Sequence, residues 1–279
     1  MASDLSFMMK FVNYHEFHTM TLQARDLVDH FLSEGRFDFT LDAASELLGA
    51  DNGTTLAALS RLRRRKQVFS PAKGLYIAVP PEYRSWGVLP GEWFIDAMMR
   101  HRDRPYYVAL LTAAGMHGAS HQAPQVFQVM TDRPVERRDV GRVRLRFFVS
   151  ENVEADPVVQ MAVPTGYVVV GSKETTVVDL ISRPRHSGGL SNVATIVKEI
   201  GELRGSALAR IASRRGRAIA RRVGWLIEEF GEVDDLEALR QAARTDLGEP
   251  ALLDPSGPRR GRADRNWALR LNKEVVPDI

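Results

Sequence analysis

Cysteine is absent from this sequence of 279 residues. Disulfides, thiolate nucleophiles and cysteine-ligated zinc are therefore excluded, and the absence fits a protein of the reducing cytoplasm, where we expect this one. Long apolar runs are also absent, because the longest mostly apolar stretch, residues 106–116, is about half as long as a membrane-spanning helix. The N-terminal residues show no basic leader and no small-residue cleavage site, which argues against a signal peptide.

Acidic residues are missing from long stretches that are rich in arginine and lysine. Residues 61–73 contain six basic residues and no acid, and residues 204–222 contain seven arginines and no acid. A third basic stretch, residues 259–273, is interrupted only by Asp264. The net charge is only +3, so the distribution of the charge is more informative than its total. Such clustering favours a surface that binds the phosphates of nucleic acid over ordinary solvated helix faces, in which acids are interspersed.

The N-terminal part of the chain has the element order of a winged helix-turn-helix. Its periodicity and turn residues predict a helix, a short strand, two helices and a hairpin, in the order 21–33, 37–39, 40–48, 54–66 and 68–79. Thr40 is the expected N-cap of the second helix. We therefore expect an N-terminal extension over residues 1–19 and a winged helix-turn-helix DNA-binding domain over residues 20–82.

Beyond this region the pattern changes to a mixture of helices and strands. A linker is predicted at residues 83–91, followed by an α/β domain with a helical C-terminal region at residues 92–279. Helices are expected at 92–100, 107–117, 173–181, 192–201 and in several segments after 207, and strands at 126–131, 143–149, 167–170 and 267–272. The expected fold class is α+β.

The predicted helix at residues 54–66 is the most specific candidate for binding. At about 100° per residue, Leu59 and Leu62 fall on its buried stripe. The first residues of the helix usually meet base edges, its N-terminal amides favour phosphate, and Arg63, Lys66 and the wing residue Lys73 are placed to reach the DNA backbone. The predicted DNA-binding residues are Asn52, Thr54, Thr55, Ala57, Arg61, Arg63, Arg64, Arg65 and Lys73. Two other interpretations stay open: a solvated basic helix without a ligand, and a winged helix that binds protein.

The residues that resemble catalytic or metal motifs lack the rest of those motifs. His117 and His121 have the spacing of paired metal ligands, but no third ligand is evident nearby, so both are interpreted as structural. Residues 171–173 lack the upstream glycine and the residue order of a phosphate-binding loop, and Ser172 is interpreted as an N-cap. Glu174 and Asp179 face different sides of their helix. We therefore predict no catalytic site, no metal, no cofactor and no enzymatic activity.

Several blocks of sequence in order resemble the AbiEi-type antitoxins, which are transcriptional regulators of type IV toxin–antitoxin pairs. The resemblance covers roughly residues 20–272. It is carried by the winged-helix start with Gly74-Leu75-Tyr76 and by residues 106–111, 117–122, 126–129, 165–167 and 188–193.

The resemblance implies an N-terminal domain that binds repeats in double-stranded DNA at its own promoter and represses the operon. It also implies a C-terminal region that acts as antitoxin to a cognate nucleotidyltransferase toxin without forming a stable complex with it. As the location of the antitoxin activity we hypothesise a basic face around residues 214–222. The alternatives are an antitoxin that binds its toxin directly, a DNA-targeted nuclease, and a winged-helix regulator that senses a small ligand.

Overall fold

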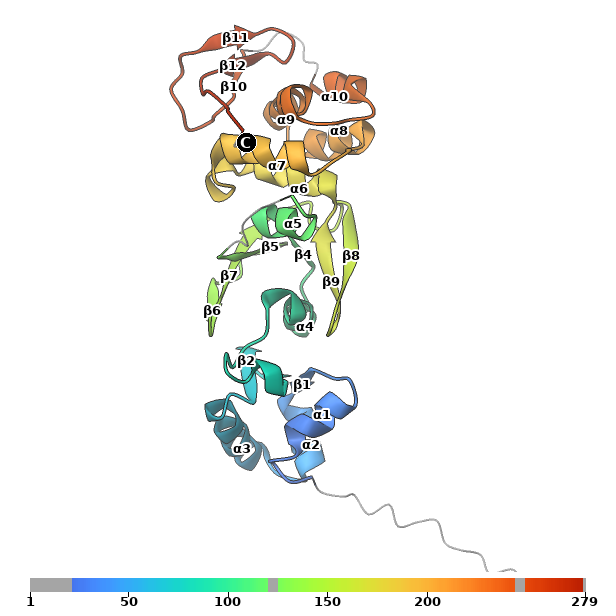
Figure 1. Ribbon diagram of the computed structural model, residues 1–279, viewed down its shortest axis with the longest axis vertical. Helices are drawn as coiled ribbons and strands as arrows, with labels where there is room; N and C mark the ends of the chain where they lie inside the picture. The colour runs from blue at the N-terminus through green and yellow to red at the C-terminus, as the bar shows by residue number, and fades with distance from the viewer. Residues whose placement is uncertain (1–21, 120–124, 244–248, 278–279) are drawn as a thin grey trace, which may run out of the picture.

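The molecule is elongated, with its helices and strands arranged in three groups along the long axis (Figure 1). The computed structural model describes residues 22–119, 125–243 and 249–277. The extension expected at residues 1–19 lies outside the described residues. In the described part of the chain, no helix combines the length and the apolar character needed to cross a membrane.

The N-terminal group contains three helices and a three-stranded antiparallel sheet of order β1-β3-β2. Its elements are α1 (Leu27–Ser33), β1 (Asp38–Thr40), α2 (Leu41–Leu48), α3 (Asn52–Arg64), β2 (Val68–Ala72) and β3 (Leu75–Ala78). This is the order of elements that the sequence predicts. Thr40 caps α2 as expected, since its hydroxyl accepts a hydrogen bond from Ala43 N–H at 3.2 Å. Apolar faces of the three helices pack together, and Phe31 stacks on Phe39 with ring centroids 4.2 Å apart.

Two helix boundaries in this group differ from the prediction. Helix α1 begins at Leu27 and not at residue 21, because the preceding residues form a turn in which Asp26 N–H donates to the carbonyl of Gln23. Helix α3 begins at Asn52 and not at residue 54, because Asp51 is its N-cap and accepts hydrogen bonds from two backbone amides of the first turn. It ends before Lys66, whose φ of 59° breaks the helical geometry.

The middle group is a six-stranded mixed sheet of order β6-β7-β5-β4-β9-β8. Its strands are β4 (Tyr106–Val108), β5 (Phe127–Thr131), β6 (Arg138–Val140), β7 (Val143–Val149), β8 (Val158–Val163) and β9 (Gly166–Gly171). β4 is parallel to β9 and β5 is parallel to β7, whereas the other neighbours are antiparallel. One face of the sheet packs on α4 (Ile95–His101), and the other packs on the helices that follow in the chain.

The helix predicted at residues 107–117 is wrong in its first half. Tyr106–Val108 forms the inner strand β4, and only Leu110–Met116 forms a helix, α5. Leu110 has a φ of 53°, which separates the two elements. A fully buried strand and a fully buried helix are both continuously apolar, so periodicity does not distinguish them. Strands β6 and β8 were also not predicted from the sequence.

The segment predicted as a linker is packed into the molecule. Val88 and Leu89 are buried and belong to the same apolar cluster as Phe69 of β2 and Met98 of α4. Two short 3-10 helices, Pro81–Tyr83 and Gly91–Trp93, flank this segment. The hairpin of the N-terminal group is therefore joined to the central sheet by a continuous apolar core.

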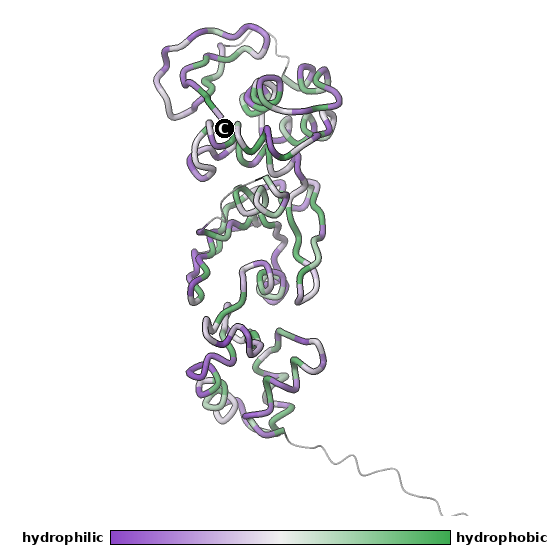
Figure 2. Tube along the Cα trace, in the orientation of Figure 1, coloured by the Kyte–Doolittle hydropathy of each residue, from purple (hydrophilic) through white to green (hydrophobic). Residues whose placement is uncertain are grey.

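The C-terminal group is mostly helical, as predicted. It contains α6 (Lys173–Ser182), a 3-10 turn (Pro184–His186), α7 (Gly189–Glu199), α8 (Gly205–Arg214), α9 (Arg217–Phe230), α10 (Leu236–Ala243) and a small sheet of β10 (Ala251–Leu252), β11 (Arg262–Asp264) and β12 (Leu269–Leu271). The buried side chain of Trp267 anchors the small sheet on α9 beside Gly224. The strands of the central sheet are mainly apolar, whereas loops of the terminal sheet are mainly hydrophilic (Figure 2). The whole chain is a mixed α+β fold.

Candidate nucleic-acid interface

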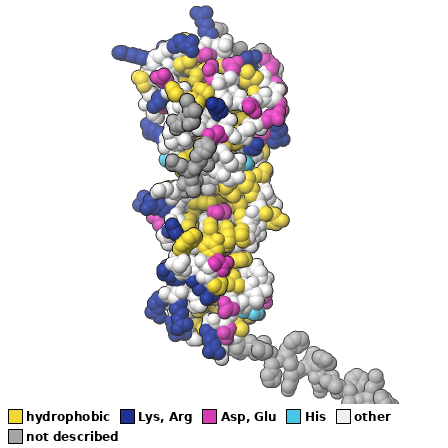
Figure 3. Space-filling view, in the orientation of Figure 1, with side chains coloured by type: hydrophobic (Ala, Val, Ile, Leu, Met, Phe, Trp, Pro, Cys, Tyr) yellow, Lys and Arg dark blue, Asp and Glu magenta, His cyan; other side chains and the backbone are white. Residues whose placement is uncertain are grey.

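Helix α3 presents a basic face to solvent. Leu59 and Leu62 are buried, as the helical wheel predicts. Except for Thr55, the candidates of this region are exposed: Asn52, Thr54, Ala57, Arg61, Arg63, Arg64 and Arg65. Within the described residues, no carboxylate lies within ion-pair distance of these four arginines. Lys and Arg side chains gather at the lower left of Figure 3, over α3. The helix thus offers a positive surface whose charge is not neutralised by its own neighbours.

Thr55 does not belong to this surface, contrary to the prediction. Its side chain is fully buried, on the same stripe as Leu59 and Leu62. The hydroxyl oxygen has no hydrogen-bond partner in the described part of the molecule. A buried side chain cannot contact DNA, so Thr55 is removed from the candidate set.

The N-terminus of α3 already carries an anion. Oδ1 of Asp51 accepts from the backbone N–H groups of Gly53 and Thr54 at 2.8 and 3.0 Å, and its Oδ2 accepts from the Thr54 hydroxyl at 2.7 Å. The hydrogen bond from the Thr54 side chain, followed by those from the two amides, lowers the pKa of the Asp51 carboxyl. The expected phosphate site at these amides is therefore filled by the chain itself, and DNA would approach the middle and C-terminal half of the helix.

The turn of the hairpin packs against the second part of the molecule. The backbone carbonyl of Lys73 lies 2.9 Å from Nε2 of His101 in α4. The side chain of Lys73 is exposed. This contact with α4 therefore fixes the position of the hairpin turn that carries Lys73.

A second basic region lies on β6 and β7 and was not predicted from the sequence. It contains Arg137, Arg138, Arg142, Arg144 and Arg146. Further Lys and Arg side chains appear on the left of Figure 3 at the level of this hairpin, above α3. The acids Glu136 and Asp139 interrupt the arginines, and Asp139 pairs with Arg146 at 3.0 Å. This region therefore does not stand out in the sequence as a basic run without acids.

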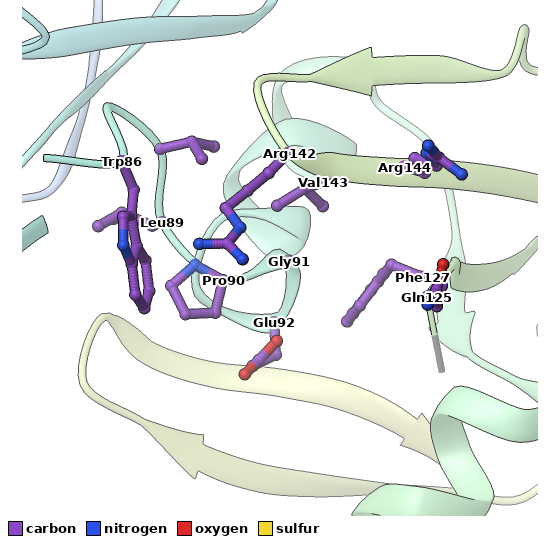
Figure 4. Close-up of a pocket in the computed structure, with 11 residues that line it drawn as sticks. Trp86, Leu89, Pro90, Gly91, Glu92, Gln125, Phe127, Arg142, Val143 and Arg144 are labelled. Carbon is purple, nitrogen blue, oxygen red and sulfur yellow. The ribbon is translucent and has the colours of Figure 1, made fainter. Parts of the chain in front are cut away.

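An open hollow of about 420 Å³ lies between this hairpin and the linker (Figure 4). The Arg142 guanidinium stacks over the exposed ring of Trp86 at 4.7 Å from the ring centroid. Leu89 and Phe127 line its apolar part. Because Arg142 and Arg144 are exposed at its rim, the hollow extends the basic surface of β6 and β7.

The basic run at residues 204–222 does not form the free basic face that was hypothesised for antitoxin activity. Arg214 donates to the carbonyl of Ala155 at 2.6 Å, and Arg222 donates to the carbonyl of Leu252 at 2.8 Å. Arg204 pairs with Glu174 at 3.0 Å. These arginines are held by groups that come from distant parts of the sequence, so residues 214–222 do not form a continuous free basic face, although Arg217 is exposed.

Arg215 belongs to a buried charged cluster between the sheet and the C-terminal helices. Its guanidinium contacts the carboxylates of Asp156 and Asp179, and both carboxylates are fully buried. The hydroxyl of Tyr107 in β4 donates to Asp179 at 2.8 Å, and its oxygen lies 3.3 Å from a carboxylate oxygen of Asp156. Burial raises the pKa of the Asp179 carboxyl, and the nearby charge of Arg215 opposes this rise. The two carboxylates are closed to solvent and Arg215 is nearly so, and we therefore interpret the cluster as a structural connection.

The residues that resemble metal or phosphate motifs have structural contacts. Nε2 of His117 lies 2.7 Å from the carbonyl of Gly171, while His121 lies outside the described residues. Ser172 accepts from Thr175 N–H and is the N-cap of α6, as predicted. In the ranges that the structure describes, no group of three or more His, Asp or Glu side chains is placed to hold a metal ion.

Comparison with known proteins gives a family and a similar fold. Residues 107–229 match the family model of the AbiEi antitoxin C-terminal domain. The structure is similar to the crystal structure of the RV2827C protein from Mycobacterium tuberculosis, with a TM-score of 0.63 and 15% sequence identity over 88% of this chain and 90% of that chain. No curated protein matches the sequence. At this identity the structural likeness concerns the fold, whereas the family match covers the central sheet and the helices up to α9.

Proposed function

We propose that this chain, whose residues 107–229 match the family model of the AbiEi antitoxin C-terminal domain, is an antitoxin that also binds the promoter of its own operon and represses it. In this proposal, residues 20–82 act as a winged helix-turn-helix. The three helices and the antiparallel sheet of order β1-β3-β2 support this role. The observation that carries the proposal is the exposed face of α3, with four arginines that no described carboxylate neutralises.

The arrangement of α3 divides its residues between two kinds of contact. An α-helix fits the major groove of DNA, and Ala57 is small enough to let the helix approach the bases closely. Arg61 and Arg64 flank this small residue and are assigned to base edges. Arg63, Arg65 and Lys73 are assigned to phosphates, whereas Asn52 and Thr54 lie beside the Asp51 carboxylate at the start of the helix and are assigned no phosphate. Leu56 is 46% exposed on α3 and is an additional candidate for contact with a thymine methyl group.

The proposal is tested by fluorescence anisotropy on a labelled fragment from upstream of the gene, against a scrambled fragment of the same length, at two salt concentrations. Tight binding that prefers the upstream fragment and weakens steeply with salt is expected. The double substitution Arg61→Ala and Arg64→Ala should abolish the preference. Arg25→Ala with Arg36→Ala is a matched control, because it removes the same charge from exposed positions outside α3. An unchanged preference in a folded Arg61→Ala, Arg64→Ala variant would refute the assignment of α3.

The second part of the proposal concerns the toxin. The antitoxin domain is proposed to counteract a nucleotidyltransferase toxin encoded in the same operon, without a stable complex. The test is growth rescue on co-expression with the neighbouring gene, together with co-purification of the two products. Rescue without co-purification is expected. Stable co-purification would favour the alternative, in which the antitoxin binds its toxin directly and the winged helix is a protein-interaction module.

A further inference from the structure

The last strand of the central sheet, β8, leaves its outer edge unpaired. The sheet order ends β4-β9-β8, and no other strand of the described residues pairs with β8. An exposed strand edge offers backbone N–H and C=O groups to another chain, and proteins usually protect such edges with charges or by shortening them. The opposite edge of the same sheet is protected in this way, because β6 has three residues and includes Arg138 and Asp139. β8 has six residues and none of this protection.

The surface around β8 is apolar and uncharged. Residues 157–172, which include both β8 and β9, contain no charged side chain. Three of the large hydrophobic side chains that are exposed lie here: Val158 at 43%, Val159 at 38% and Tyr167 at 63%. In Figure 3 hydrophobic side chains form the right-hand border at the level of β8 and β9, on the side away from the basic surface.

The pattern of polarity along β8 is symmetric about Gln160. On each side of this residue stand two apolar residues, Val158 and Val159 before it and Met161 and Ala162 after it. An isologous contact between two copies requires a surface that is complementary to itself. Antiparallel pairing centred on Gln160 would place Gln160 opposite Gln160 of the second copy, where the two amides can hydrogen-bond to each other.

The same register places apolar residues opposite apolar residues. Val159 would face Met161 of the second copy, and Val158 would face Ala162. Directly paired residues of antiparallel strands point to the same face of a sheet. Val159 and Met161 lie beside Val170 and Val168 of β9, on the face that packs on α4, so the paired sheets would join their apolar faces in register.

We propose that two copies of this chain associate through antiparallel pairing of β8 with β8, which extends the six-stranded sheet across a two-fold axis at Gln160. Because residues 157–172 carry no charge, two copies of net charge +3 can approach each other at this edge without repulsion between charged side chains there. Each copy has one unprotected edge, so the association stops at the dimer. This proposal does not depend on DNA binding and is tested without DNA.

The absence of native cysteine makes a single-cysteine experiment specific. Directly opposite residues of antiparallel strands have Cα atoms about 4.5–5.5 Å apart, which is within the range of a disulfide. The full-length variant Gln160→Cys is therefore expected to form a disulfide-linked dimer under mild oxidation. Asp139→Cys, on the protected edge β6, is the matched control and should form little disulfide-linked dimer, although it keeps β8.

Sedimentation velocity over a range of protein concentrations tests the association without cross-linking. The unmodified chain should show a concentration-dependent dimer. Val159→Lys should shift it to the monomer, with a melting temperature equal to that of the unmodified chain at concentrations where both are monomeric. Val159→Thr should retain the dimer.

A monomer at all concentrations, or equal cross-linking of Gln160→Cys and Asp139→Cys, would overturn the proposal. A dimer that persists in Val159→Lys would also overturn it, because another surface would then be in use. If the chain is monomeric at all concentrations, and Val159→Lys loses toxin neutralisation whereas Val159→Thr keeps it, the edge of β8 would be assigned to the toxin instead.

Discussion

Removal of Arg215 should destabilise the protein strongly, because it leaves two buried carboxylates without their shared cation. The side chain of Arg215 is 9% exposed, and those of Asp156 and Asp179 are fully buried. Breaking a buried ion pair by removing one partner costs about 3–5 kcal/mol. We therefore expect Arg215→Met to lower the free energy of unfolding by roughly this amount. For a chain of this size that corresponds to a decrease of roughly 6–20 °C in melting temperature.

The neighbouring Arg214 provides the control. It also lies near Asp156, at 3.8 Å, but its side chain is 35% exposed, so solvent screens the interaction. Arg214→Met should cost at most about 1 kcal/mol. Both variants keep most of the apolar stem of the arginine side chain, so the comparison isolates the charge of the guanidinium group.

The pH dependence gives a second readout. Burial raises the pKa of Asp179 in the folded protein, so folding favours the protonated carboxyl. The cost of holding this group charged is absent at pH values below its unfolded pKa of about 4 and is complete above the folded pKa. Loss of Arg215 removes the opposing charge and raises the folded pKa further. The destabilisation by Arg215→Met should therefore be smaller at pH 5 than at pH 8.

The assay is thermal and urea unfolding, followed by circular dichroism at both pH values. Adding Asp179→Asn to Arg215→Met removes one of the two carboxylate charges that have lost this cation and should restore part of the lost stability at pH 8. The reasoning is refuted if Arg215→Met lies within about 1 kcal/mol of the unmodified chain at pH 8, or if its effect is equal at both pH values.

Two further substitutions test the packing described above. In Gly224→Ala, the new Cβ would lie 1.9 Å from a ring carbon of Trp267, so we expect a loss of about 1–3 kcal/mol from overpacking, measured by urea unfolding. A stability equal to that of the unmodified chain would show that the small sheet moves away from α9 without cost. In Thr55→Val, a buried hydroxyl without a described partner is replaced by a methyl group, so the melting temperature should stay constant or rise, and DNA affinity should not change. A loss of DNA affinity in this folded variant would return Thr55 to the binding surface.

Local features of the sequence predicted most of the N-terminal group and the orientation of α3. Thr40 as a cap, the hairpin that turns at Gly74 and the buried stripe of Leu59 and Leu62 depend on residues within one or two turns of each other. The N-cap role of Asp51 is also local, and an acid that immediately precedes a helix was a signal for it. The position of Tyr106–Val108 was not predicted, because a strand buried on both faces has no alternation to detect.

The sequence by itself determined the order of the N-terminal elements, the exposed arginines of α3 and the family resemblance. The tertiary structure alone decided which arginines are available to a ligand. Arg61 and Arg64 stay exposed, while Arg215 is neutralised by carboxylates 59 and 36 residues earlier in the chain. It also decided that β8 lies at a sheet edge, since the place of a strand depends on pairing with distant strands. The sign of a side chain's charge follows from its residue type. Its solvation and its partners depend on which groups the fold brings within a few ångströms of it.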